Sequence, residues 1–283
     1  MSTHLLIKLF LSAKSTTAPG TQKWYRDRLD IIRHYLPDIP LTDLTTAILY
    51  TTIAEIAARY TNPHYQFTII RALATLIKFA FDEEFIPRPL HKRIKKPNLP
   101  KRVIRGLSVA DQNTIINAAQ KPRDKALLSL LSDTACRVAG IANLQTADIN
   151  LITCSAIVTE KGNKQRRVFF TPQTAKLISR YLDTRPPADN LFTTLPDPTK
   201  PLTPKGIYEI TKRLSKKANI PKGWNPHAWR HGRIRHMLTH GMNLNMVSQI
   251  AGHATTAITG DIYGTLNDAD LEQQYRLYTD KNV

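Results

Sequence analysis

The sequence predicts a mainly α-helical protein with a small β-sheet, an α+β fold divided into two domains. Three observations predict it. Apolar residues recur at helical spacing up to residue 81, a basic, proline-rich stretch follows at 88–105, and strand-like runs at 147–171 are enclosed by further helical patterns. A chain of 283 residues is long enough for two domains that each bury a core.

The first domain is expected to be helical throughout. Its apolar residues follow the helical period in four segments, at 4–13, 21–36, 45–60 and 64–81. The stripe of the last segment is expected to face the core and consists of Phe67, Ile70, Leu73, Ala74 and Ile77. Residues 4–11 superficially resemble the apolar part of a signal peptide, but Lys8 interrupts them and no basic segment precedes them. We therefore expect an amphipathic helix there, and no apolar run is long enough to span a membrane.

The stretch from Arg88 to Arg105 is expected to connect the two domains. It holds eight Lys or Arg residues and no Asp or Glu, and its prolines favour an extended chain. Such a connector either follows a DNA backbone or is a solvated linker that touches nothing, and the lack of acids favours DNA. The candidate DNA contacts are Lys92, Arg93, Lys95, Lys96, Lys101, Arg102 and Arg105, together with Lys164 further along the chain.

The second domain is expected to open at Ser108, which has the character of a helix N-cap with Asp111 three residues later. Residues 161–165 form a turn signal between two strand-like runs, so we expect a β-hairpin there. The strands are expected at 147–152, 155–160 and 166–171. The helices are expected at 109–120, 122–133, 172–183 and 203–218, from about Pro226, from about Leu244, and at 268–278.

The charge balance indicates a polyanionic partner. Lys and Arg number 40 against 22 Asp and Glu, a net charge of +18. Nucleic acid is the preferred interpretation, because neutralising phosphates releases counterions. An acidic membrane and charge that serves only solubility are the alternatives. The two cysteines, Cys136 and Cys154, form neither a disulfide framework nor zinc-ligand spacing, which fits a reducing, cytoplasmic location.

The segment from Asn225 to Arg230 has the features of an anion-binding helix start. Asn225 suits the N-cap position and Pro226 the first helical position, and His227 and Arg230 then lie on one face. A helix N-terminus already favours an anion, and the two side chains strengthen it. A solvated basic helix start is the alternative for this segment taken alone.

Two pairs of histidines in the same region suit a metal by spacing. His227 and His231 lie four residues apart, as do His236 and His240. A zinc protease of the His-Glu-x-x-His type needs glutamate where Ala228 stands, and no other ligands converge. We therefore expect no metal and no cofactor.

An ordered set of residues makes the chain resemble the tyrosine recombinase, or phage integrase, family. The loop 133–137 ends in an arginine, the hairpin turn carries a lysine, and His-x-x-Arg is followed by Gly-His and then by a tyrosine after Asp-Ile. The spacings of 23 residues from Arg230 to His253 and ten from His253 to Tyr263 match the family pattern. The set is Arg137, Lys161, His227, Arg230, His253 and Tyr263.

The resemblance implies that Tyr263 attacks a DNA phosphate and forms a 3′-phosphotyrosine intermediate. It implies that Arg137 and Arg230 hold the phosphate oxygens, since guanidinium groups bind them in bidentate fashion. Lys161 would protonate the leaving 5′ oxygen, with Lys164 as the neighbouring candidate.

The same resemblance gives the two histidines their tasks. His227 would act in proton transfer or bond a phosphate oxygen, and His253 would hydrogen-bond the scissile phosphate.

The resemblance also implies an architecture and partners. Residues 1–96 would be a helical core-binding domain, 97–107 a basic linker, and 108–283 the catalytic domain with a tail from about 265, together forming a C-shaped clamp on DNA. The partner would be a double-stranded recombination site, bound by a homotetramer that exchanges strands through a Holliday junction. When free, the protein would be a monomer or a weaker oligomer, and accessory proteins are compatible with this scheme. Tail residues Leu271, Tyr275 and Tyr278, spaced as one helix face, either pack within the chain or dock onto a neighbouring subunit.

Two positions depart from the family pattern. The family usually has glutamate three residues after the first arginine, where this chain has Gly140, so the support of the active-site loop is in question. Trp229 stands where a smaller aliphatic residue is usual. Three other functions compete with recombination: a DNA-binding protein without catalysis, a relaxing enzyme similar to type IB topoisomerases, and a metal-dependent hydrolase.

Overall fold

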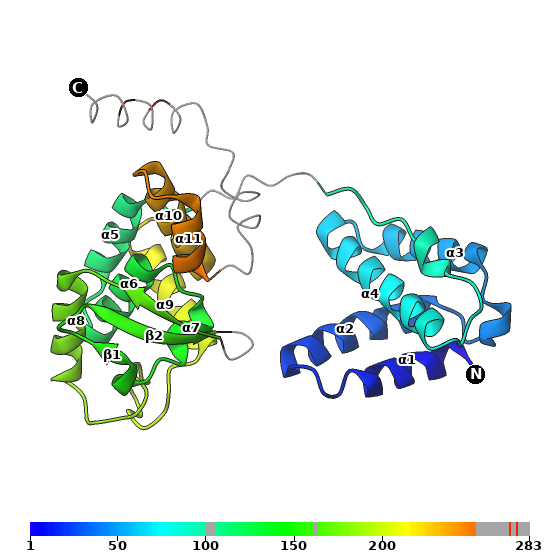
Figure 1. Ribbon diagram of the computed structural model, residues 1–283, viewed down its shortest axis with the longest axis horizontal. Coiled ribbons are helices and arrows are strands. Elements are labelled where there is room, and N and C mark those ends of the chain that lie inside the picture. The colour runs from blue at the N-terminus through cyan, green and yellow to red at the C-terminus, as the bar shows by residue number, and fades with distance from the viewer. Residues whose placement is uncertain (100–105, 161–163, 253–271, 273–275, 277–283) are drawn as a thin grey trace. The chain divides into compact units, whose positions relative to one another are not determined.

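The structure is a computed structural model that describes residues 1–99, 106–160, 164–252, 272 and 276, and the chain divides into two compact units, Met1–Arg102 and Val103–Val283 (Figure 1). Both units are built mainly from helices, and one small sheet lies in the second unit. The predicted α+β class is confirmed. No helix in the part of the chain that the structure describes has the length and apolar content needed to cross a bilayer.

The first unit contains the four helices that the sequence predicts. They are α1 (Thr3–Ala13), α2 (Pro19–Tyr35), α3 (Thr46–Arg59) and α4 (Pro63–Asp82), with a 3-10 turn η1 (Leu41–Asp43) before α3. Helix α4 packs against the other three, and Ile70, Leu73 and Ile77 of its predicted stripe are buried in a core with Phe10, Leu29 and Ile32. The other two residues of the stripe, Phe67 and Ala74, are half-buried. The side chain of Asn62 begins α4 by accepting hydrogen bonds from the backbone N–H groups of His64 and Tyr65.

The connector begins differently from the prediction. Residues Leu90–Arg93 form a 3-10 turn, η2, that packs on α4, so the chain is not extended from Arg88 onward. Apolar contacts explain this turn, because Leu90 packs against the core and Ile94, four residues later, is buried in it. The basic residues around them stay exposed.

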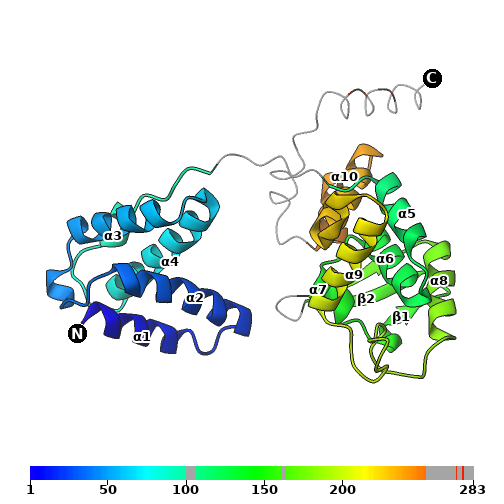
Figure 2. The ribbon, with the colours of Figure 1, turned by 180° about the vertical axis from the view of Figure 1, so that it is seen from behind.

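In the second unit, helices pack against one side of a three-stranded sheet, and the other side exposes Ile157 and Phe169 (Figures 1 and 2). The strands β1 (Ile149–Asn150), β2 (Ser155–Glu160) and β3 (Lys164–Phe169) form an antiparallel sheet in the order β1-β2-β3, with Glu160 opposite Lys164. The helices are α5 (Val109–Ala118), α6 (Pro122–Thr134), α7 (Val138–Ala142), α8 (Pro172–Leu182), α9 (Pro204–Lys217), α10 (Pro226–Thr239) and α11 (Leu244–Ala251), with 3-10 turns η3 (Thr146–Asp148) and η4 (Pro221–Trp224).

Three local predictions in this unit are corrected. The first strand is only two residues long, because η3 precedes it and the side chain of Asn150 turns the chain by accepting from the N–H groups of Ile152 and Thr153. Strand β3 begins at Lys164, so two residues of the expected turn are paired in the sheet. The short helix α7 was not expected. The predicted helix at 268–278 lies outside the described residues, apart from positions 272 and 276.

Gly106 and Gly232 allow two backbone segments to cross in contact. The N–H of Leu107 donates to the carbonyl of Ala228 at 2.9 Å, and the side chain of Gln112 donates to the carbonyl of Leu107 at 2.9 Å. A Cβ on Gly232 would collide with the backbone carbonyl oxygen of Leu107, which cannot withdraw without breaking these bonds. The start of the second unit is therefore fixed to α10.

Replacing Gly232 with alanine is expected to lower the free energy of unfolding by about 2 to 3 kcal/mol, because the added methyl overpacks a backbone contact. Urea unfolding of the variant measures the effect. Gly20→Ala is the matched control: nothing lies within 4 Å of that position in α2, so the helix should be unchanged or more stable by up to about 1 kcal/mol. Equal stability of the Gly232 variant and the parent would contradict the crossing.

Candidate active site

The loop that carries Arg137 begins with a left-handed residue at the end of α6. Ala135 has φ 51°, which turns the chain sharply after Thr134. The hydroxyl of Thr134 donates to the carbonyl of Leu130 at 2.7 Å and accepts from the N–H of Cys136 at 3.4 Å. The turn delivers Arg137 to the N-cap position of α7, with its side chain half-buried.

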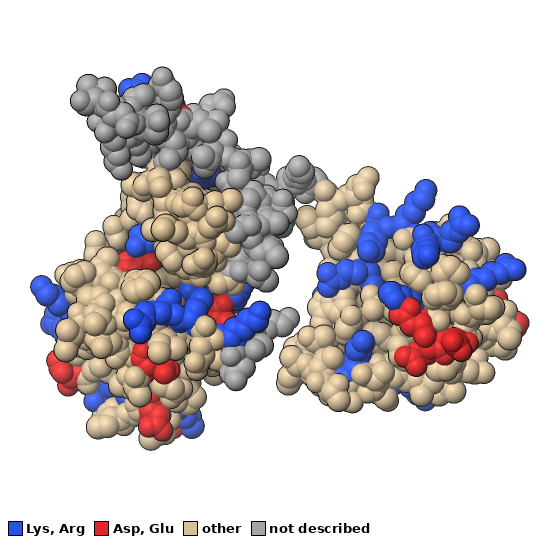
Figure 3. All heavy atoms as spheres, viewed as in Figure 1, with Lys and Arg blue, Asp and Glu red and all other residues tan. Residues whose placement is uncertain are grey.

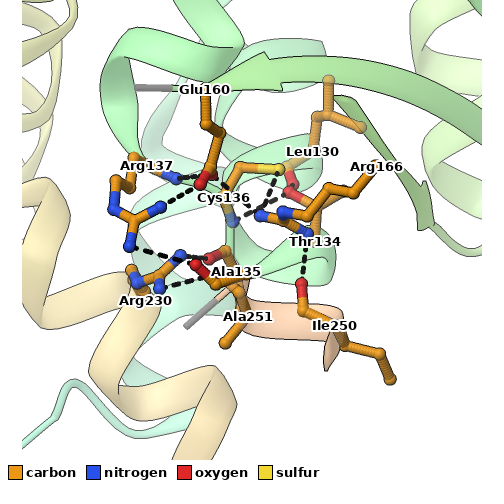
Figure 4. A network of polar contacts seen from close by, with 11 residues as sticks. Leu130, Thr134, Ala135, Cys136, Arg137, Glu160, Arg166, Arg230, Ile250 and Ala251 are labelled. Carbon is orange, nitrogen blue, oxygen red and sulfur yellow. Dashed lines mark hydrogen bonds and ion pairs between the residues drawn. The ribbon is translucent and has the colours of Figure 1, made fainter. Parts of the chain in front are cut away.

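Three arginines donate to three successive carbonyls at the end of α11 (Figure 4). Arg166 of β3 donates to Ile250, Arg230 of α10 donates to Ala251 at 2.8 Å, and Arg137 donates to Gly252 at 3.2 Å. The last carbonyls of a helix lack intrahelical partners and carry its negative partial charge, so cations suit them. Residues far apart in the sequence are thereby brought together immediately before position 253.

Gly252 ends α11 as its C-cap. Its φ of 68° is the left-handed conformation of a helix C-cap, which glycine adopts without strain. A Cβ there would lie 2.6 Å from Nε of Arg166, so the close packing of this arginine also requires glycine.

Arg230 links two of these segments from a buried position. Only 4% of the residue is exposed, and its Nη1 and Nη2 donate to the carbonyls of Ala135 and Ala251. The guanidinium therefore joins the left-handed turn after α6 to the end of α11. A planar group with several N–H donors can make such a bridge, whereas a lysine cannot.

A carboxylate that the sequence analysis did not identify completes the network. Glu160, the last residue of β2, forms ion pairs with Arg137 and with Arg166, the latter at 2.9 Å. Burial raises the pKa of Glu160, but the charges and hydrogen bonds of the two arginines outweigh burial and hold it below the usual value. One feature of the sequence distinguishes Glu160: it is the single acidic residue between Asp148 and Asp183, in a segment with several basic residues.

His227 lies in the first turn of α10, as predicted. Asn225 is the N-cap, and its side chain accepts from the N–H of His227 at 2.9 Å. Partial burial of the ring, followed by the positive charges of Arg230 and Arg137, lowers the pKa of His227. The ring is therefore neutral near pH 7 and able to accept a proton.

Trp229 packs as part of the core. It is fully buried, and its indole N–H donates to the carbonyl of Gly223 at 2.7 Å. The large ring thus fixes α10 to η4, and this departure leaves the neighbouring Arg230 in place.

The remaining predicted site residues divide into two groups. Lys161, His253 and Tyr263 lie outside the described residues, as do Lys101, Arg102, Arg105 and the tail residues Leu271, Tyr275 and Tyr278. The candidate DNA contacts that are described are all exposed: Lys92, Arg93, Lys95, Lys96 and Lys164. Figure 3 shows Lys and Arg side chains gathered in groups on the visible face of each unit, with fewer Asp and Glu.

The histidine pairs do not assemble a larger ligand set. Within residues 1–99, 106–160 and 164–252, no group of three or more His, Cys, Asp or Glu side chains is arranged to hold a metal ion. His236 and His240 instead lie with their ring centroids 3.8 Å apart, and Nδ1 of His240 lies 2.8 Å from the carbonyl oxygen of His236.

His231 is expected to make the second unit sensitive to acid. Burial, with the charges of His227 and Arg230, lowers the pKa of His231 from 6.5 to about 4. The unfolded chain therefore binds a proton below pH 6.5 that the folded chain does not, so stability is complete above this pH and is lost as the pH falls towards 4. When the pH falls from 7 to 5, the free energy of unfolding should decrease by about 1 kcal/mol because of His231, after allowance for solvent screening. Urea unfolding of wild type and His231→Gln at both pH values measures it, and an equal pH dependence in the two proteins would refute it.

Comparison with known proteins gives matches over most of the chain. Residues 104–270 match the phage integrase family. The tyrosine recombinase XerA of Pyrococcus horikoshii is 31% identical over 211 residues, covering 72% of this chain and 70% of the relative. The tyrosine recombinase XerD of Staphylococcus epidermidis is 28% identical over 216 residues, covering 73% of each chain.

Solved structures share the fold. A Tn1549 transposon integrase in complex with circular intermediate DNA superposes with a TM-score of 0.79 at 16% identity, over 100% of both chains. A lambda integrase dimer bound to a COC′ core site gives a TM-score of 0.77 at 16% identity, over 95% of this chain and 98% of that one.

Proposed function

Because the chain belongs to the phage integrase family of tyrosine site-specific recombinases, we propose that Tyr263 is its nucleophile. The protein is a site-specific recombinase that breaks and rejoins DNA strands. One observation carries the assignment of the site: Arg137 and Arg230 meet at the two carbonyls that immediately precede His253. These three residues and Tyr263 all fall within the matched range 104–270.

The reaction is a transesterification at a DNA phosphodiester. The hydroxyl oxygen of Tyr263 bonds to phosphorus, the bond from phosphorus to the 5′ oxygen breaks, and a 5′ hydroxyl leaves. The 3′-phosphotyrosine retains the energy of the phosphodiester bond. A 5′ hydroxyl of another strand can therefore attack it and release the tyrosine, and exchange of the first pair of strands gives a Holliday junction.

The two arginines stabilise the charge that develops on the non-bridging oxygens. Arg137 keeps 38% of its side chain exposed, so a phosphate can reach it, while Arg230 is buried and holds the backbone of the two adjacent segments. Preorganised donors of this kind typically contribute about 3 to 4 kcal/mol each to the transition state. The cations supply the stabilisation that a metal provides in other phosphoryl-transfer enzymes.

Proton transfer falls to the hairpin and to α10. Lys161 donates the proton to the leaving 5′ oxygen, with Lys164 as the neighbouring candidate. His227 accepts the proton that the Tyr263 hydroxyl loses, because its lowered pKa leaves the ring neutral near pH 7 with a nitrogen available to take it. His253 bonds the scissile phosphate.

The first unit and the connector bind the DNA duplex around the cleaved site. We assign core binding to residues 1–96, the linker to 97–107 and catalysis to 108–283. The exposed basic residues near η2 support the DNA role of the connector. The lambda integrase of similar fold is a dimer bound to a core site. For strand exchange we propose that this protein forms a homotetramer, which the tail from about 265 helps to assemble. Accessory proteins take part where the DNA site requires them. Such a protein works on DNA at the nucleoid.

A nicked suicide substrate tests the proposal. The nick lets a short fragment with the 5′ hydroxyl diffuse away, so the covalent complex accumulates and survives denaturation. We expect a covalent DNA–protein band in EDTA. A protein that binds the site tightly but never forms the band is a DNA-binding protein without catalysis, and cleavage only with added metal would indicate a hydrolase.

A further inference from the structure

Gly140 leaves a space that Glu160 occupies. A Cβ built on Gly140 would lie 3.6 Å from Cγ and 3.8 Å from Oε1 of Glu160, at ordinary contact distance. A methyl group would fit there, whereas a side chain as long as glutamate that extended in the same direction would meet the carboxylate. Helix α7 and the end of β2 pack together at this point, and both Gly140 and the Glu160 side chain are shielded from solvent.

The carboxylate holds Arg137 at two points. Glu160 pairs with Nη1 of Arg137 and accepts from its backbone N–H at 3.4 Å. It therefore sets both the path of the loop and the direction of the guanidinium, whose Nη2 is then placed at the carbonyl of Gly252.

Arg166 fixes the carboxylate in turn. Its Nη2 donates to Oε1 of Glu160 at 2.9 Å, while Nη1 donates to the carbonyl of Ile250 (Figure 4). Only 6% of the Glu160 side chain is exposed, so the carboxylate is shielded from solvent. A buried carboxylate between two guanidinium groups is held in a fixed orientation by their hydrogen bonds. The chain of contacts runs from the end of α11 through Arg166 and Glu160 to Arg137.

We propose that Glu160 is the positioning carboxylate of Arg137, supplied by β2 in place of an acid on α7, and that the small residue at position 140 leaves room for it. The inference rests on the proposed function, in which Arg137 binds the scissile phosphate. Glu160 does not touch the DNA in this role; it acts through Arg137. The loop that carries Arg137 is then supported by Glu160, although position 140 has no acid.

Moving the acid back to α7 tests the proposal. Four proteins are compared with wild type: Glu160→Gln, Glu160→Gly, Gly140→Glu, and the exchange variant that carries Glu160→Gly with Gly140→Glu. The single-turnover rate of covalent complex formation at saturating protein, the affinity for the DNA site and the unfolding midpoint are measured for each. Glu209→Gln, which removes an exposed acid on α9, is the matched control.

The expected result is a loss of rate that the exchange repairs. Glu160→Gln and Glu160→Gly should each slow cleavage by about 10- to 100-fold with DNA affinity within about threefold, because Arg137 loses its orientation and not its charge. Gly140→Glu alone should also be slow, since two carboxylates then compete for one space. The exchange variant should recover at least about tenfold over Glu160→Gly, which a merely structural role of Glu160 would not produce.

Three results would overturn the proposal. Unchanged cleavage by Glu160→Gln means that the carboxylate does not set the rate. The second result is a slow exchange variant that is folded. If its cleavage rate falls by the product of the two single-variant effects, and its unfolding midpoint stays close to that of wild type, a carboxylate at position 140 cannot replace the one at position 160. Absence of a covalent complex in wild type overturns the proposed function itself, and the positioning role with it.

Discussion

Replacing Tyr263 with phenylalanine is expected to abolish the covalent DNA complex while leaving DNA binding nearly unchanged. The substitution removes one oxygen, the atom that forms the bond to phosphorus, and Tyr263 is the single tyrosine in the sequence between His253 and Tyr275. The measurement is the denatured suicide-substrate assay beside a binding titration on the same DNA.

Tyr35→Phe is the control for this prediction. Tyr35 is the last residue of α2 in the first unit and its ring packs against the core there, so its loss tests whether removal of any phenol weakens the assay. We expect the control to form the complex at the wild-type rate. A covalent band that persists in the Tyr263 variant would show that another residue attacks the phosphate.

Replacing Arg230 with lysine is expected to slow cleavage by about 100- to 1,000-fold, equivalent to about 2.7 to 4 kcal/mol of transition-state stabilisation. The substitution keeps the charge but loses the planar group that spans the carbonyls of Ala135 and Ala251. The loss should appear in the single-turnover rate and not in substrate affinity, because the donors act mainly on charge that develops during the reaction.

Arg233→Lys is the matched control, since Arg233 lies one turn further along α10. Its Nε donates to the carbonyl of Asp133 at 3.1 Å, away from the end of α11. We expect this variant to cleave within about fivefold of wild type, in line with a contact that is mainly structural. Similar rates for the two lysine variants would show that position 230 has no special part in the chemistry.

The parts of the fold that local chemistry determines were predictable. The helices of the first unit follow from apolar spacing, and the caps at Ser108, Asn225 and Gly252 follow from side chains or a glycine acting within three residues of themselves. The strand expected at 147–152 failed for an equally local reason, because an asparagine side chain ends it after two residues.

The candidate site was predictable only in part, because its geometry depends on distant segments. Arg137 lies 115 residues from the carbonyl that it contacts, and 23 residues from Glu160. No periodicity in the sequence relates such positions; tertiary packing of α7, β2 and α11 brings them together. The resemblance identifies Arg137 and Arg230, whereas Glu160 and Arg166 join the site only through tertiary contacts with Arg137 and with the end of α11.

The contact between Gly140 and Glu160 also constrains how such a chain can change. If one carboxylate must stand beside Arg137, moving it from one position to the other takes two substitutions, and each single step leaves either two acids or none in the same volume. The two positions are then epistatic, and neither substitution is neutral alone. A hairpin transplanted from a relative with its acid on α7 would therefore arrive without a partner for the arginine, and chimeras of such recombinases should exchange the hairpin and the arginine loop as one segment.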